Sequence, residues 1–231
     1  MPPTVYFVTG ASRGIGFALV QQLSKRDNVL VFAGARDPST SNQLNALAQS
    51  LPEGKVVVVK LDSVSDEDAE AAAKLVQQKA DKVDVLIANA GVATGFELPV
   101  DQQSAADFVK MTDINAGGAS PHLQGPRAAA VQVGRAQAPA ATGYTASKPA
   151  LNMIFARIHA ENRNPHNMTA FVICHGHTQT DMGNEGARLM GAEQAPTKVE
   201  DSVNGILGLV DEEAGKYSCR FMSWDGAERP W

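Results

Sequence analysis

A tyrosine and a lysine four residues apart form the clearest chemical pair in the chain. Tyr144 and Lys148 lie in the stretch YTASKPALNMIFARIHAEN, whose pattern predicts a helix. Residues at this spacing share one helix face, so the lysine ammonium can approach the phenol. A nearby cation favours the phenolate and lowers a tyrosine pKa that is ordinarily about 10. We therefore predict that Tyr144 acts as a general acid and that Lys148 lowers its pKa. The alternative is a surface pair at helical spacing.

A glycine-rich string near the start of the chain indicates a site for phosphate groups. The string GASRGIG lies between a strand candidate, residues 4–8, and an amphipathic helix pattern. Glycines let the backbone approach a pyrophosphate, and a helix N-terminus offers free N–H groups and a positive dipole end. The alternative is a glycine-rich turn without a ligand. The residues expected to bind a dinucleotide are Gly10, Ser12, Arg13, Gly14, Ile15 and Gly16.

Alternating strand and helix patterns must position these two motifs. Runs rich in β-branched residues at 4–8, 29–33, 55–61 and 83–88 alternate with amphipathic stretches, and Ser65 and Asp68 are placed like a capping box before a helix ending at 80. This order predicts an α/β doubly wound parallel sheet, the Rossmann fold, in a single NAD(P)-binding domain over residues 1–231. Farther along, we expect a helix from 142, a strand at 169–174, a polar loop with Gly183, Gly186 and Gly191, a helix at 200–210 and a strand at 217–222.

Composition excludes several classes of protein. Lys plus Arg is 20 and Asp plus Glu is 25, so the net charge of 20 − 25 = −5 leaves no basic stripe for nucleic acid. Two cysteines make neither a disulfide scaffold nor a zinc site. No run approaches the roughly 18 apolar residues of a membrane span. The opening residues do not resemble a signal peptide, so we expect a cytoplasmic protein.

The motifs together resemble those of the short-chain dehydrogenase/reductase family, along nearly the whole chain. TGASRGIG is similar to the cofactor fingerprint of that family. The remaining matches are Asp62 after the third strand, the triplet Asn89, Ala90 and Gly91 after the fourth, Asn115, the Y-x-x-x-K pair Tyr144 and Lys148, and Thr180 after a later strand.

This resemblance implies a role for each matched residue. Asp62 would contact adenine, and the 89–91 triplet would flank the cofactor. Asn115 would hold a water linked to Lys148 and relay a proton, while Lys148 would also bind the cofactor ribose. Thr180 would hold the nicotinamide amide.

Charge next to the ribose indicates which cofactor is used. A 2′-phosphate needs a cation, whereas NAD needs a carboxylate on the 2′-OH. Arg13 lies in the glycine string and Arg36 just past the second strand, at positions that resemble NADPH-preferring members. We therefore expect NADPH; the alternative is two solvated surface arginines, and Asp37 beside Arg36 weakens the case.

A narrower resemblance lies in the C-terminal third. Residues 176–203 and the closing DGAERPW are similar to fungal norsolorinic acid ketoreductases. This implies an NADPH-dependent ketoreductase of secondary metabolism that acts on a small-molecule ketone of the aromatic polyketide type, with residues from Gly183 onward covering the substrate.

The stretch 116–141 departs from the family. Its catalytic serine should precede Tyr144 on a fifth strand, but no Ser or Thr occurs from Pro121 to Ala141, and Asn115 lies only 144 − 115 = 29 positions before Tyr144. We expect the fifth strand to be missing or degenerate, through a deletion or a sequence error, which puts a homo-oligomer in doubt. A nucleotide-binding pseudoenzyme is the alternative function.

Two single residues also depart from the family pattern. Pro149 follows Lys148 and removes one helix hydrogen bond. His175 stands where the family has proline. His175 and His177 form an H-x-H pair, but without acidic or cysteine partners at suitable spacing we expect no metal site.

Overall fold

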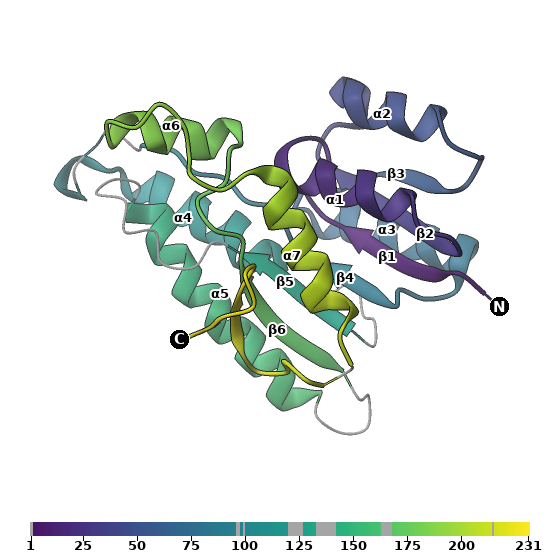
Figure 1. The fold of residues 1–231 in the computed structure, drawn as a ribbon. Helices are drawn as coiled ribbons and strands as arrows, with labels where there is room; N and C mark the ends of the chain where they lie inside the picture. The colour runs from purple at the N-terminus through teal and green to yellow at the C-terminus, as the bar shows by residue number, and fades with distance from the viewer. Residues whose placement is uncertain are drawn as a thin grey trace.

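The structure contains a single mixed sheet (Figure 1), and the glycine string and the 89–91 triplet follow the carboxyl ends of two of its central strands. The computed structural model describes residues 2–95, 98, 100–119, 127–132, 142–162, 168–213 and 215–231. The described strands have the order β3-β2-β1-β4-β5-β6-β7-β8, and all neighbours are parallel except β7 and β8. The predicted doubly wound α/β fold is therefore confirmed. The winding reverses between β1 and β4, which is where ligands of such folds bind.

Five strands, β1 to β4 and β6, agree with the predicted runs to within a few residues, whereas β5 and β8 were not predicted and β7 begins later than expected. They are β1 (Thr4–Val8), β2 (Val29–Ala35), β3 (Val56–Lys60), β4 (Val85–Ile87), β5 (Arg127–Gln132), β6 (Thr169–Cys174), β7 (Phe221–Ser223) and β8 (Glu228–Arg229). The strand expected at 217–222 begins only at Phe221, because residues 215–219 form a turn.

Helices cover both faces of the sheet. They are α1 (Gly14–Ser24), α2 (Asn42–Gln49), α3 (Asp66–Ala80), α4 (Ala105–Asn115), α5 (Thr142–Glu161), α6 (Asp181–Leu189) and α7 (Val199–Asp211), with short 3-10 turns η1 (Pro38–Thr40), η2 (Val100–Gln102) and η3 (Gly117–Ala119). Among these described helices, none is long and apolar enough to cross a membrane.

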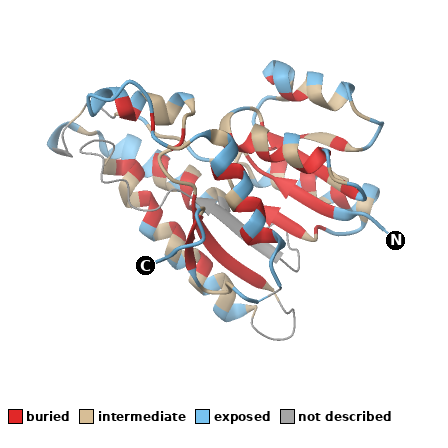
Figure 2. Ribbon diagram, viewed as in Figure 1, coloured by how far each residue is buried: buried red, intermediate tan, exposed pale blue. Residues whose placement is uncertain are grey.

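Alternation along β1 shows how the two helical layers form. Tyr6 and Val8 join the apolar cluster under α1, α2 and α7, whereas Val5 and Phe7 join the cluster under α3 and α5. Burial accordingly runs along the central strands in Figure 2. α4 packs against α5 at the end of the second layer and carries the site described below (Figure 1).

The strand that was expected to be missing is present. β5 pairs with β6 along its full length and ends with Gln132 opposite Cys174. It pairs with β4 through Ala128 and Ala129. Its alanine-rich sequence lacks the large apolar residues that mark a buried strand, but two flanking strands supply the hydrogen bonds that hold it. The rest of the expected defect, at 120–126 and 133–141, lies outside the described residues.

The prediction of a polar loop after β6 is wrong, because α6 forms there. The Thr180 side chain caps the helix by accepting a hydrogen bond from the Gly183 N–H at 3.1 Å. One of the glycines that suggested a loop, Gly183, serves close packing instead, because a Cβ there would lie 1.9 Å from Thr178 O.

Only one of the two side-chain hydrogen bonds of the capping box predicted at the start of α3 is present. Ser65 Oγ accepts a hydrogen bond from the Asp68 N–H at 3.1 Å, which confirms the N-cap. The Asp68 carboxylate does not complete the box. It accepts instead from Lys60 Nζ at 2.8 Å and from the Asp62 N–H at 3.0 Å.

Candidate active site

One threonine joins the carboxyl ends of β1 and β4, where the winding reverses. Thr9 Oγ1 accepts hydrogen bonds from the N–H groups of Asn89 at 3.0 Å and Ala90 at 2.9 Å. Asn89 Nδ2 donates in return to Thr9 O at 3.0 Å and to Gly10 O at 3.3 Å. These bonds bring the glycine string and the 89–91 triplet together, as a common cofactor site requires.

The glycine string fits a dinucleotide by its shape and by its open helix end. A Cβ at Gly16 would lie 2.2 Å from Gly10 O and 2.5 Å from Asn89 Nδ2, so only glycine allows this close approach. α1 begins at Gly14 with no side-chain cap from Arg13 and no acidic residue in its first turn. Its N–H groups and dipole are therefore available to a pyrophosphate.

The predicted catalytic pair lies on the first two turns of α5. Tyr144 and Lys148 are each only 6% exposed, and Lys148 Nζ lies 4.5 Å from the centroid of the Tyr144 ring. A Cβ at Gly91 would lie 3.9 Å from Nζ, so the amino group reaches the 89–91 triplet. No hydrogen bond to Nζ occurs among the described residues. A buried amino group without a protein partner fits the implied binding of ribose hydroxyl groups.

Burial sets the charge of both members of the pair. It raises the pKa of Tyr144, and the nearby Cys174 thiol adds to this effect. It lowers the pKa of Lys148 to about 7. The expected lowering of the Tyr144 pKa is therefore not found, because removal from water outweighs the attraction of an amine that lies over the ring face. Tyr144 is held in its protonated form, which is the form that donates a proton.

Asn115, at the end of α4, ties the loop after β4 to the catalytic helix. The side chain is 1% exposed; Nδ2 donates to Val92 O at 2.9 Å and to Ser147 Oγ at 3.0 Å, and Oδ1 accepts from the Val92 N–H at 2.7 Å. Ser147 Oγ then donates to Tyr144 O at 2.7 Å. Asn115 thus positions Tyr144, while its role in a proton relay stays a prediction.

Thr180 lies over the glycine string. A Cβ at Gly14 would lie 3.3 Å from Thr180 Cγ2, so the N-terminus of α6 and the N-terminus of α1 are in near contact. This places Thr180 next to the glycine string. Its hydrogen bond to a nicotinamide amide stays a prediction.

The next two residues of α6 extend the same contact. Asp181 lies 3.8 Å from Arg13, and both side chains are exposed. Met182 packs against the buried pair Met111 and Tyr144. α6 therefore contacts both the glycine string and the cluster that contains Tyr144.

The two arginines predicted to select the cofactor differ in their surroundings. Arg36 is exposed and has no ion pair among the described residues. The neighbouring carboxylate, Asp37, is occupied by Ser39, whose N–H and hydroxyl donate at 2.9 and 2.6 Å. Arg13 shares its charge with Asp181. Arg36 is thus the freer cation.

Two other residues of the glycine string, Ser12 and Ile15, are at least partly buried in the fold. Ile15 is buried in the core beneath α1, and Ser12 is half-buried in the turn.

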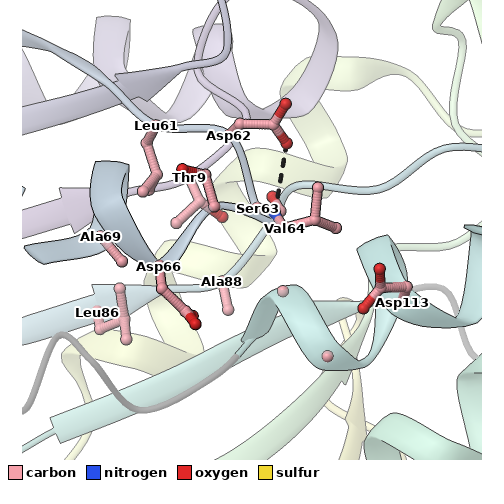
Figure 3. A pocket seen from close by; sticks show the side chains of 13 residues that line it. Thr9, Leu61, Asp62, Ser63, Val64, Asp66, Ala69, Leu86, Ala88 and Asp113 are labelled. Carbon is pink, nitrogen blue, oxygen red and sulfur yellow. Dashed lines mark hydrogen bonds between the residues drawn. The ribbon is translucent and has the colours of Figure 1, made fainter.

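Asp62 lies beside a cavity of about 280 Å³ between the ends of β3 and β4, the start of α3 and the turn after α4 (Figure 3). Its Oδ1 accepts from the Val64 N–H at 3.3 Å. Apolar side chains such as Leu86 and Ala88 line the cavity together with the carboxylates of Asp62, Asp66 and Asp113. Because Thr9 also lines it, the cavity adjoins the cofactor motifs, which fits the adenine contact implied for Asp62.

The two histidines after β6 are held by separate local bonds. Thr178 Oγ1 donates to His175 O at 2.8 Å, so His175 Nδ1, 3.1 Å away, is the donor to that hydroxyl. Burial, with the nearby Lys148 charge, lowers the pKa of His175 to about 3, so the ring is uncharged at neutral pH. His177 Nε2 donates to Gly183 O at 2.6 Å. Within the described ranges, no three His, Cys, Asp or Glu side chains gather to hold a metal ion.

Sequence reasoning missed two residues that build this site. Thr9 and Ser147 directly precede the glycine string and Lys148, and both hydroxyl groups are buried. Their positions next to a motif were the available signal. Their partners Asn89, Ala90 and Asn115, however, lie far away in the sequence and become neighbours only in the fold.

Comparison with known proteins assigns this arrangement to a family. Residues 4–125 match the family model described as short chain dehydrogenase. The norsolorinic acid ketoreductase of Aspergillus parasiticus is 36% identical over 257 residues, covering 100% of this chain and 93% of that protein. The norsolorinic acid ketoreductase of Emericella nidulans is 35% identical, covering 99% and 94%. The chain belongs to the short-chain dehydrogenase/reductase family and is an oxidoreductase that acts on a small molecule.

A solved structure extends the agreement to the whole fold. The NADPH-bound carbonyl reductase from chicken fatty liver aligns over 100% of both chains with a TM-score of 0.84 and 26% identity. Its family supports a nicotinamide cofactor at the site described here.

Proposed function

We propose that this protein is an NADPH-dependent ketoreductase that reduces a ketone on an aromatic, polyketide-type substrate. The buried pair Tyr144 and Lys148, beside the glycine string, is the observation that carries the proposal. The relatives named for norsolorinic acid reduction support the substrate class. Their names, over nearly full-length matches, do not favour the alternative of a nucleotide-binding pseudoenzyme.

The chemistry divides between cofactor and protein. A bound nicotinamide supplies the hydride. Tyr144 supplies the proton, because its raised pKa keeps the hydroxyl protonated when the carbonyl oxygen needs it. The Lys148 ammonium stabilises the negative charge left on the phenol. Asn115 and Ser147 hold Tyr144 at a fixed position while the proton moves.

The surroundings of Tyr144 fit an apolar substrate. Val92, Ala93 and Met182 pack against the cluster of Met111 and Tyr144. Thioethers adapt to irregular shapes and contact aromatic rings favourably, by about 0.3–1.5 kcal/mol. These side chains therefore suit the planar, uncharged body of an aromatic ketone.

NADPH is preferred in this proposal because Arg36 has an exposed and unshared charge. A hydrogen bond to a charged phosphate contributes about 1.5–3 kcal/mol, so Arg36→Ser should raise the KM for NADPH about ten- to hundredfold and leave that for NADH unchanged. Arg157→Ser is the control, because that exposed arginine pairs with Glu161 on α5. Equal effects on both cofactors would contradict the preference.

The deciding experiment measures NADPH consumption with norsolorinic acid and a panel of simpler aryl ketones. We expect turnover, and a loss of at least about 10²-fold in kcat for Tyr144→Phe with unchanged NADPH affinity. Turnover that survives this substitution, or wild-type protein that binds NADPH and reduces none of the ketones, would refute the proposal.

A further inference from the structure

A carbonyl that receives a proton from Tyr144 also needs a second hydrogen-bond donor. Such a donor polarises the carbonyl and stabilises the charge that develops on its oxygen. The sequence has no Ser or Thr from Pro121 to Ala141, the stretch that precedes the catalytic helix. A hydroxyl donor must therefore come from another element.

The loop after β4 is held next to the catalytic helix by two independent ties. The Asn115 side chain accepts a hydrogen bond from the Val92 N–H at 2.7 Å and donates one to the Val92 carbonyl at 2.9 Å. Farther along, Gln103 Nε2 donates to Gly95 O at 3.4 Å, while its Oε1 accepts at 3.2 Å from the N–H of Gly143, the residue before Tyr144. The backbone at 92–95 is thus fixed on both sides of Thr94.

Thr94 presents a hydroxyl group that is only weakly engaged. Its Oγ1 donates to Met111 Sδ at 3.7 Å, and a thioether is a weak acceptor. Met111 itself packs against Tyr144 in the same buried cluster. Thr94 is exposed, so a ligand can reach it. Its proton can therefore turn from the sulfur to a carbonyl oxygen at little cost.

The other hydroxyl groups near Tyr144 are less suitable. Ser147 Oγ donates to Tyr144 O, and Thr178 Oγ1 donates to His175 O, so both protons are used within the protein. Thr142 and Thr145 are two positions before and one after Tyr144 on a helix, and residues at those spacings do not face each other.

We infer that Thr94 is a catalytic residue that donates a hydrogen bond to the substrate carbonyl oxygen while Tyr144 protonates it. Thr94 keeps its proton throughout; only the Tyr144 proton and the hydride are transferred. This inference rests on the proposed ketoreductase function and names the donor that the function requires.

The test compares two substitutions at one position. Thr94→Val keeps the shape and removes the hydroxyl, and it should lower kcat about 10²-fold with NADPH affinity unchanged. Thr94→Ser keeps the hydroxyl and should retain most of the activity. Thr112→Val is the matched control, because that hydroxyl donates to Phe108 O within α4 at 2.9 Å. Wild-type kcat in Thr94→Val, or an equal loss in Thr94→Ser, would overturn the assignment.

Binding provides a readout that does not depend on turnover. Acetophenone is titrated into the protein saturated with NADP+, where no hydride is available. Loss of one hydrogen bond costs about 1–1.5 kcal/mol, so Thr94→Val should weaken acetophenone binding about tenfold. An unchanged Kd would overturn the assignment even if the wild-type protein reduces no ketone, a result that would refute the proposed function separately. A loss found only in Gln132→Leu would overturn it as well and place the donor at the end of β5.

Discussion

Replacing Lys148 by methionine should stabilise the protein by an amount that depends on pH. Burial lowers the pKa of this lysine from 10.5 to about 7, whereas the unfolded chain keeps the higher value. The unfolded state therefore binds more protons between pH 7 and 10.5, and wild-type stability rises with pH across that window. One pKa unit corresponds to about 1.36 kcal/mol. The buried lysine therefore lowers the free energy of unfolding by about 5 kcal/mol below pH 7 and by about 2 kcal/mol at pH 9. Lys148→Met removes this penalty.

Urea unfolding at pH 6 and pH 9 measures the difference directly. We expect the gain in free energy of unfolding to be larger at pH 6 by about 3 kcal/mol, with the m-value unchanged. Lys74→Met is the control, because Lys74 is exposed on α3 and should show no such pH dependence. A gain that is the same at both pH values, or a loss at pH 6, would refute the reasoning. The variant should be inactive with every ketone, since Tyr144 loses the ammonium.

Three further substitutions test parts of the site and its helix. Gly16→Ala should abolish NADPH binding in a fluorescence titration, because its Cβ would lie 2.2 Å from Gly10 O; binding within twofold of wild type would contradict this packing. Ser147→Ala breaks the bonds from Asn115 and to the Tyr144 carbonyl and should cost about 1–3 kcal/mol in urea unfolding, with a lower kcat; Ser147→Thr should restore part of both. Pro149→Ala restores a helix hydrogen bond at an exposed position and should raise stability by up to about 3 kcal/mol, and a lower Tm would contradict this expectation.

The parts of the fold that the sequence predicts well are those with strong local signals. The valine run that became β3 and the apolar runs of β1 and β6 fix their own strands, because buried parallel strands need continuous apolar residues. The glycine string and the triplet at 89–91 were predicted to share a site, and Thr9 joins them. Helical spacing predicted that Tyr144 and Lys148 share one helix face, and Lys148 Nζ lies 4.5 Å from the centroid of the Tyr144 ring.

The parts that were not predicted depend on tertiary contacts. β5 has three alanines in sequence and forms because β4 and β6 flank it. α6 contains glycines, which are typical of a loop, yet one of them, Gly183, allows close contact with the backbone at Thr178. The Tyr144 pKa was predicted in the wrong direction, because four-residue spacing indicates the presence of a neighbour but not the depth of burial.

The hydrogen bonds at the start of α5 show which part of the chain holds this helix in place. Among the described residues, the hydrogen bonds that hold the first two turns of this helix to other elements come from Gln103 and Asn115, both of which precede the stretch 116–141. The alignment with the Aspergillus parasiticus relative has 257 positions for 231 residues here, so at least 257 − 231 = 26 have no counterpart in this chain. Because Tyr144 and Lys148 are anchored from upstream of 116–141, a change in the length of that stretch would leave these hydrogen bonds in place.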